Sequence, residues 1–180
     1  MHIMKSSYTS KIDFGDVIAT LVFMINPRRI VEFGILEGFS LSRMIESCSD
    51  DCKIDAYDIF DKFNGNSANK AMIESAFSPR ATIHEGDYYK QWELFEDGSI
   101  DILHIDIAND GDTYETAIDR YMGKMAVGGV MILEGGSEER DKLDWMVKYN
   151  KRKIVPVLKG YGGRYKTIES YPSMTIIMKC

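Results

Sequence analysis

The chain has 180 residues, of which 44% are hydrophobic, and a formal net charge of −6. That length supports one full hydrophobic core, and an acidic balance disfavours general nucleic-acid binding, which requires neutralisation of phosphates. The longest apolar run, at 17–25, has nine residues, whereas a helix needs about 20 to cross a bilayer. We therefore expect a single domain, over residues 1–180, that contacts neither nucleic acid nor membrane.

The N-terminus and the cysteines predict where the protein works. The opening "MHIMKSSYTS" lacks the basic-then-apolar pattern of a secretion signal. An odd number of cysteines, here Cys48, Cys52 and Cys180, is typical of a reducing compartment. No neighbouring His or Cys completes a zinc set with Cys48 and Cys52, so we interpret them as ordinary thiols. These features predict a cytoplasmic protein.

Helices and strands are predicted to alternate along most of the chain. Apolar residues at helical spacing predict helices at 13–25, 41–48, 67–77, 88–95, 114–125 and 137–150. Short β-rich runs predict strands at 29–33, 53–59, 81–86, 99–106 and 129–134. Two further strands are predicted from "KIVPVL" at 153–158 and "SMTIIMK" at 173–179.

This alternation predicts an α/β fold: a parallel sheet of five strands with helices on both faces. Residues 159–172 contain glycines and a proline but no helical stripe. Because parallel neighbours usually need a crossover helix, the last two strands are predicted to form a C-terminal antiparallel hairpin. The segment "GYGGRY" at 160–165 is predicted to be a mobile flap.

The segment "RIVEFGILEGFSL" at 29–41 predicts a ligand site. Ligands of open α/β sheets lie beyond the carboxyl ends of the strands, and Gly34 and Gly38 fall at that point after the first strand. Gly34 permits a tight turn, and Gly38 opens the N-terminus of the next helix. However, Glu32 replaces the first glycine of the dinucleotide fingerprint, and its charge suits a pyrophosphate badly. NAD and FAD are therefore disfavoured.

Acidic residues end the other predicted strands as well. Asp58, Asp87, Asp106 and Glu134 occupy these positions. Carboxylates bind ammonium groups and sugar hydroxyls through charge-assisted hydrogen bonds. The predicted rim therefore suits a ligand that carries positive charge and a diol.

These motifs resemble those of class I S-adenosylmethionine-dependent methyltransferases. "VEFGILEGFSL" is similar to their first motif, "DAYDIF" and "EGD" to the ribose and adenine motifs, and "LHIDIANDGDTYE" to the fourth motif. The resemblance spans roughly residues 28–179. It implies S-adenosylmethionine as cofactor and a Rossmann-like, seven-stranded sheet, with residues 1–27 forming an N-terminal helix and lid.

The resemblance also implies roles for the acids. Glu32 would lie near the methionine ammonium, Asp58 would bind the two ribose hydroxyls, and Asp87 would face the adenine amine. Asp106 would lie beside the sulfonium. The predicted cofactor-binding residues are Glu32, Gly34, Glu37, Gly38, Ser40, Asp58, Ile59, Asp87 and Asp106.

Several of these residues also have a structural interpretation. Glu32 and Asp58 are alternatively strand-end acids that bind backbone amides, and Asp87 is alternatively a helix cap. His84 and His104 lie within apolar strands, and we interpret them as core histidines. Tyr88, Tyr114 and the stripe of methionines are likewise interpreted as core residues.

Methyl transfer depends mainly on holding the acceptor in line with the methyl group, and an oxygen acceptor also requires a base. The predicted catalytic residues are Asp106, Asp110 and Glu134. More narrowly, the chain resembles small-molecule O-methyltransferases of the catechol and macrocin type, many of which bind magnesium. Their acidic pair after the fifth strand is replaced by Glu134-Gly135-Gly136. Asp106 and Glu134 could still hold a divalent ion together with Asp110 and waters, so magnesium is possible but not favoured, and no metal ligand is assigned.

The acceptor is predicted to be a small molecule, contacted from residues 1–13, 60–70, 107–113 and 159–172 or from a second subunit of a homodimer. Arg164 and Lys166 favour an anionic acceptor. Two alternatives remain open. The acid-rich loop at 106–112 would also suit an aminopropyl-transferring enzyme that holds a polyamine, and the domain could bind the cofactor without catalysis.

Overall fold

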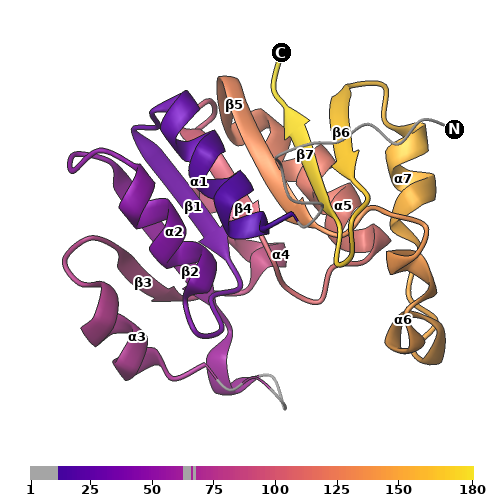
Figure 1. The fold of residues 1–180 in the computed structure, drawn as a ribbon, viewed down its shortest axis with the longest axis horizontal. Coiled ribbons are helices and arrows are strands. Elements are labelled where there is room, and N and C mark those ends of the chain that lie inside the picture. Colours follow the sequence, from indigo (N-terminus) through magenta and orange to yellow (C-terminus); the bar gives the residue numbers. More distant parts are fainter. Residues whose placement is uncertain (1–11, 63–65, 67) are drawn as a thin grey trace, which may run out of the picture.

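The computed structural model describes residues 12–62, 66 and 68–180, and its centre is a seven-stranded sheet. The strand order is β3-β2-β1-β4-β5-β7-β6, and Figure 1 shows the helices packed around this sheet. The strands are β1 Arg29–Phe33, β2 Lys53–Asp58, β3 Thr82–Glu85, β4 Ile100–Ile105, β5 Met125–Glu134, β6 Arg164–Ile168 and β7 Met174–Met178. The first five are parallel, and β7 is antiparallel to both β5 and β6, so the predicted fold class is confirmed.

Helices cover both faces of the sheet. Residues of α1 Phe14–Ile25, α2 Phe39–Ser47 and α3 Lys70–Phe77 pack in one hydrophobic cluster. Residues of α4 Tyr88–Gln91, α5 Gly111–Thr116 and α7 Ile154–Gly160 pack in the other. The remaining elements are α6 Asp144–Lys148, four 3₁₀ turns (η1 Phe60–Lys62, η2 Trp92–Leu94, η4 Met122–Lys124, η5 Arg140–Lys142) and the π-helical turn η3 Ala117–Tyr121.

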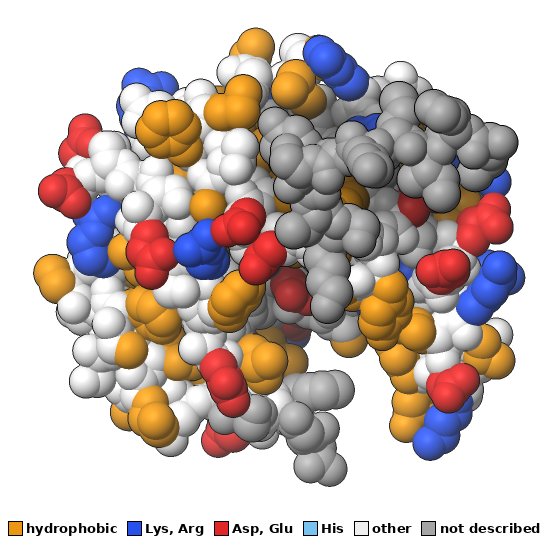
Figure 2. Space-filling view, in the orientation of Figure 1, with side chains coloured by type: hydrophobic (Ala, Val, Ile, Leu, Met, Phe, Trp, Pro, Cys, Tyr) orange, Lys and Arg blue, Asp and Glu red, His pale blue; other side chains and the backbone are white. Residues whose placement is uncertain are grey.

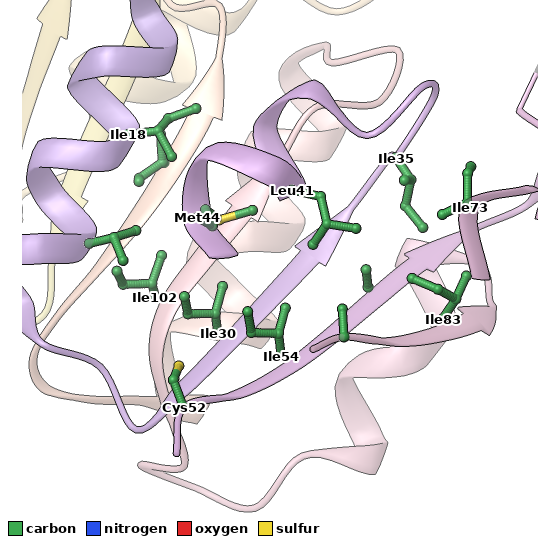
Figure 3. Close-up of a cluster of buried hydrophobic side chains, with 14 of the residues drawn as sticks. Ile18, Ile30, Ile35, Leu41, Met44, Cys52, Ile54, Ile73, Ile83 and Ile102 are labelled. Carbon is green, nitrogen blue, oxygen red and sulfur yellow. The ribbon is translucent and has the colours of Figure 1, made fainter. Parts of the chain in front are cut away.

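The alternation of side chains along the strands separates the two clusters. Figure 3 shows Leu41 and Met44 of α2 directed toward Ile30 and Ile54 of the sheet, and all four side chains are nearly inaccessible to solvent. Burial of each such side chain stabilises the fold by about 1.5–3 kcal/mol. The alternate residues of the same strands, Val31 of β1 among them, join the cluster on the opposite face.

Tyrosines dominate that second cluster. Tyr88 and Tyr121 stack with ring centroids 5.0 Å apart, and Tyr114 is fully buried. The Tyr121 hydroxyl donates to the backbone carbonyl of Tyr88, so its polar group is satisfied. The prediction that Tyr88 and Tyr114 are core residues is confirmed.

The strand predicted at 153–158 is wrong, because this segment forms α7. Pro156 is the third residue of the helix, where its missing N–H leaves no hydrogen bond unmade. The Asp141 carboxylate accepts from the backbone N–H groups of Ile154 at 2.7 Å and Val155 at 2.9 Å, which stabilises the start of α7. The other strand of the hairpin is β6, whose first two residues, Arg164 and Tyr165, lie in the predicted flap at 160–165.

The helix predicted at 137–150 is divided into η5 and α6. The Ser137 hydroxyl caps the start of this segment by accepting a hydrogen bond from the backbone N–H of Arg140 at 3.1 Å. Arg140 and Asp141 are then buried, one toward β5 and the other toward α7. Among the described residues, no helix is long and apolar enough to cross a membrane.

Candidate active site

A cavity of about 630 Å³ lies at the carboxyl ends of β1, β2, β4 and β5. Figure 2 shows the molecular surface hollowed below its centre, where the parallel strands of Figure 1 end. This volume is within the range of small-molecule sites, about 300–1,000 Å³. Residues of α1 also line it, including Phe14 and Ile18.

Glu32 of β1 is the most deeply buried acid of the site, with no exposed surface. Its Oε1 atom accepts hydrogen bonds from the Ser40 hydroxyl and from Nδ1 of His104, which is 2.9 Å away. His104 is the β4 residue paired with Glu32 in the sheet register. Among the described residues, Oε2 of Glu32 has no hydrogen-bond partner. Ser40 and His104 both line the cavity and connect it to this acid.

His104 forms a buried ion pair with Glu32. Burial opposes the charged imidazole, but the hydrogen bond and the charge of Glu32 outweigh it and raise the pKa of His104 above its ordinary value of 6.5. The core-histidine interpretation is correct as far as burial goes, since His104 is only 2% exposed. The histidine nevertheless also contributes to the cavity wall.

Asp58 lies at the end of β2, where its carboxylate connects three segments. One oxygen accepts from the backbone N–H of Ile35 at 2.8 Å, and the other accepts from the backbone N–H of Phe60 at 2.8 Å and from Asn66 at 2.7 Å. Asp58 and Ile59 both line the cavity. Asp58 therefore binds backbone amides, as in its structural interpretation, and is also placed to meet a ligand.

The glycines of the first motif have different constraints. Gly34 has φ +89°, and a Cβ there would lie 2.0 Å from the backbone oxygen of Asp106, so only glycine lets the loops after β1 and β4 approach. A Cβ on Gly38, the N-cap of α2, would meet the Phe77 ring at 2.4 Å. Gly34, Glu37 and Ser40 line the cavity, whereas Gly38 contributes through helix packing.

Asp87 is a helix cap, as in its structural interpretation. Its side chain caps α4 by accepting from the backbone N–H of Tyr89 at 3.1 Å, and it forms an ion pair with Lys90. It also lines the cavity, next to Gly86.

The three predicted catalytic acids are placed differently. Asp106 is exposed to the cavity, and no hydrogen bond from its side chain to another described residue is present. Glu134 lines the cavity too, but Arg140 binds both of its oxygens, at 2.6 and 2.8 Å. Asp110 is buried as the N-cap of α5, forms an ion pair with Lys151, and is not among the described residues that line the cavity. The structure therefore brings Asp106 and Glu134 together and keeps Asp110 apart.

Several residues that line the cavity or lie behind it were not assigned to the site from the sequence. Tyr89, Lys151 and Ser173 line it, and Arg140 lies behind Glu134. Ser173 is 1% exposed, and its hydroxyl has no partner among the described residues. No spacing pattern marks these residues, because they come from α4, the loop before α7 and the loop before β7.

The basic residues proposed as acceptor contacts lie elsewhere. Arg164 and Lys166 belong to β6, and Lys166 lines a separate cavity of about 370 Å³ with Lys159, Glu138 and Glu169. Residues 1–11, 63–65 and 67, which include part of the predicted acceptor contacts, lie outside the described residues.

The carboxylates and hydroxyls of the cavity are suited to a cationic, hydroxyl-bearing ligand. Across the described ranges, no group of three or more His, Cys, Asp or Glu side chains is placed to hold a metal. Glu32 offers a buried oxygen without a partner among the described residues, and Ser40 and His104 connect it to the cavity.

Comparisons with solved structures agree with this architecture. An SAH-bound methyltransferase from Podospora anserina superposes with a TM-score of 0.70 at 18% identity, covering 93% of this chain and 78% of that one. The O-methyltransferase TomG from Streptomyces achromogenes, which is involved in tomaymycin synthesis and was solved with SAM, gives 0.66 at 15% identity, with 92% and 79% covered. An O-methyltransferase from Bacillus cereus in complex with SAH gives 0.66 at 13% identity, with 97% and 84% covered.

At these identities the structural likeness establishes the fold alone. A search of the curated proteins finds no significant match to the sequence. The family described as "Methyltransferase domain" matches residues 31–134, which run from within β1 to the end of β5 and include Asp58, Asp87, Asp106 and Glu134 of the cavity. The chain therefore belongs to this family of methyltransferase domains.

Proposed function

We propose that the protein is an S-adenosylmethionine-dependent methyltransferase that acts on an oxygen of a small-molecule acceptor. The observation that carries the proposal is the placement of Asp58 and Asp106 at the cavity, after the two strands that flank β1, with Glu32 of β1 buried behind Ser40 and His104, which line it. The relatives bound to SAM or SAH support the cofactor, and those called O-methyltransferases support oxygen as the acceptor atom.

The residues present fit the cofactor. The unpartnered oxygen of Glu32 and the hydroxyl of Ser40 would receive its ammonium group, because a buried carboxylate oxygen is costly to leave without a hydrogen bond. Asp58 would accept from the ribose hydroxyls, and Gly34 would let the backbone pass close to the ligand. When bound, the cofactor supplies a methyl group activated by a sulfonium.

Asp106 is the proposed base for the acceptor hydroxyl. Its carboxylate faces the cavity, whereas Glu134 is bound on both oxygens by Arg140 and Asp110 is bound by the start of α5 and by Lys151. A base must lie within hydrogen-bonding reach of the proton that it accepts, which only an open carboxylate can do. Glu134 then shapes the site, and Asp110 holds Lys151 in place.

The acceptor is proposed to be small, and anionic in part. Phe14 and Ile18 of α1 line the cavity, as an N-terminal lid within a single domain would. Lys151 is the proposed contact for a negative group, in place of Arg164 and Lys166. A cytoplasmic location and a homodimer remain predictions.

An aminopropyl-transferring enzyme is the weaker candidate. A polyamine needs free acids after β4, and in this loop the carboxylate of Asp110 is already bound to α5 and to Lys151. Lys151 at the cavity would moreover repel a cationic acceptor.

Thermal unfolding with three ligands tests the proposal. S-adenosylhomocysteine at about 100 times its dissociation constant should stabilise the folded state by about 2.7 kcal/mol, which corresponds to about 5–10 °C for a chain of this size. NAD should give no shift, and decarboxylated S-adenosylmethionine should give a smaller one. A shift with NAD alone, or with none of the three ligands, would contradict the proposal.

A further inference from the structure

Glu134 forms a two-point ion pair with Arg140, to which the proposed function assigns no chemical role. Nε of Arg140 donates to one carboxylate oxygen at 2.6 Å, and Nη2 donates to the other at 2.8 Å. This two-point geometry is the strongest form of an arginine–carboxylate pair. The pair forms the wall of the cavity beside Asp106, since Glu134 and Asp106 both line it.

Several contacts hold Arg140 in place, although its buried Nη1 atom has no hydrogen-bond partner among the described residues. It is 3% exposed, its Nη2 atom also donates to the backbone oxygen of Asn109 at 3.1 Å, and its guanidinium lies 4.9 Å from the centre of the Trp145 ring. Burial opposes its charge, but the hydrogen bond and charge of Glu134 outweigh it, and the pKa of Arg140 is raised above its ordinary value. The side chain is therefore a permanent cation in a fixed position.

A divalent ion in this site would have to bind beside Glu134 and Asp106. The resembling O-methyltransferases that use magnesium hold it with the acid after the fourth strand and an acidic pair after the fifth. In this chain the two oxygens of Glu134 are already occupied by Arg140. The residues present therefore do not fit a metal ion.

Packing also prevents a second ligand from following Glu134. Gly135 has φ +101° and Gly136 has φ +106°, a backbone region that side chains strongly disfavour. A Cβ on Gly136 would lie 2.0 Å from the Thr175 hydroxyl oxygen, and one on Gly135 would lie 3.0 Å from the Ile154 side chain. The turn after β5 therefore packs closely against β7 and α7, and this packing leaves no room for the side chain of a second acid.

We propose that Arg140 is a positioning residue that takes the place of a divalent metal, so that this methyltransferase works without one. The inference rests on the proposed function. The guanidinium neutralises Glu134 and keeps it from repelling the carboxylate of Asp106, which remains open to the acceptor. A covalently attached cation also makes this arrangement independent of metal supply.

Binding of Mn²⁺, followed by electron paramagnetic resonance in the presence of S-adenosylhomocysteine, tests the inference without an acceptor. The wild type should show no specific Mn²⁺ binding up to about 1 mM, a concentration at which weak carboxylate sites for divalent ions fill. Arg140→Ala frees Glu134 beside Asp106 and should bind Mn²⁺ at least about tenfold more tightly than the wild type. Arg140→Ala/Glu134→Gln should lose the gained site.

Each outcome has a definite meaning. Specific Mn²⁺ binding to the wild type that Asp106→Asn abolishes would overturn the inference, as would an Arg140→Ala variant that folds but gains no Mn²⁺ site. If Arg140→Ala does not fold, Arg140→Gln retains more of the volume and takes its place, and the wild-type titration decides in any case. A wild type that fails to bind S-adenosylhomocysteine would instead contradict the proposed function.

Discussion

Replacement of Glu32 by glutamine tests how the cavity would recognise the amino-acid end of the cofactor. Glutamine keeps one acceptor oxygen for Ser40 and His104 but places an amide NH₂ where the unpartnered Oε2 lies. A hydrogen bond to a charged group contributes about 1.5–3 kcal/mol. Because Glu32 is fully buried, solvent screens this contact little, and the loss should reach about 10- to 150-fold in affinity for S-adenosylhomocysteine.

The assay is calorimetric titration with two ligands. S-adenosylhomocysteine carries the ammonium group, whereas methylthioadenosine shares its adenosine part and lacks the amino-acid end. Glu32→Gln should weaken binding of the first ligand and leave that of the second within about twofold, a difference below 0.5 kcal/mol. Equal losses for both ligands would show that the variant disturbs the whole cavity, and no loss for either would refute the role of Glu32.

Three further predictions concern stability, measured by urea unfolding. Gly34→Ala should cost about 2–5 kcal/mol, because its Cβ would overlap the Asp106 backbone oxygen, whereas Gly98→Ala, also at positive φ but with no atom within 4 Å, should cost only about 1–2 kcal/mol; equal costs would contradict the close approach. The raised pKa of His104 stabilises the fold fully below its unfolded value of 6.5, and this contribution is lost as pH rises through the higher folded pKa, so the free energy of unfolding should fall relative to His104→Asn as pH rises above about 6.5; parallel pH profiles would argue against the charged pair. Asp141→Ala should cost about 1–2 kcal/mol by removing the cap of α7, and an unchanged unfolding free energy would show that the cap is dispensable.

The parallel half of the fold could be predicted because its signals are local. β1, β2, β4 and the second half of β5 are buried on both faces, which favours apolar side chains at most positions, whereas the edge strand β3 is partly exposed. The acids at the strand ends could be placed for the same reason, since parallel strands end at one edge of the sheet.

In the C-terminal region β7 and the antiparallel hairpin were predicted, whereas α7 and β6 could not be predicted from local signals. The apolar run around Pro156 has the composition of a strand, and it forms α7 because Asp141, thirteen residues earlier, caps it. The edge strand β6 is half-exposed and reads "RYKTI", with no strong apolar pattern, and it forms because β7 pairs with it. Tertiary contacts therefore determine the conformation of both α7 and β6.

The same distinction applies to the site. Asp106 and Glu134 were predicted from their places after strands, whereas the contacts of their carboxylates were not: Arg140 binds Glu134, and the Asp106 side chain has no hydrogen-bond partner among the described residues. Arg140 lies in a charged segment that resembles a solvated helix, and nothing in its spacing indicates that it turns inward. Asp110 was predicted as a catalytic residue from an acid-rich loop, and its carboxylate is instead bound by the first turn of α5.

The central claim is that this cavity binds S-adenosylmethionine at the ends of the parallel strands, and calorimetric titration with S-adenosylhomocysteine tests it most directly. The wild type should bind with a micromolar dissociation constant or tighter, about −8 kcal/mol. Asp58→Asn should weaken binding at least about tenfold by losing the charge that faces the ribose hydroxyls, while the fold persists because the amide oxygen still accepts from Ile35 or Phe60. No binding to the folded wild type would mean that Glu32, Asp58 and Asp106 are structural acids and that the proposed methyltransferase activity is wrong.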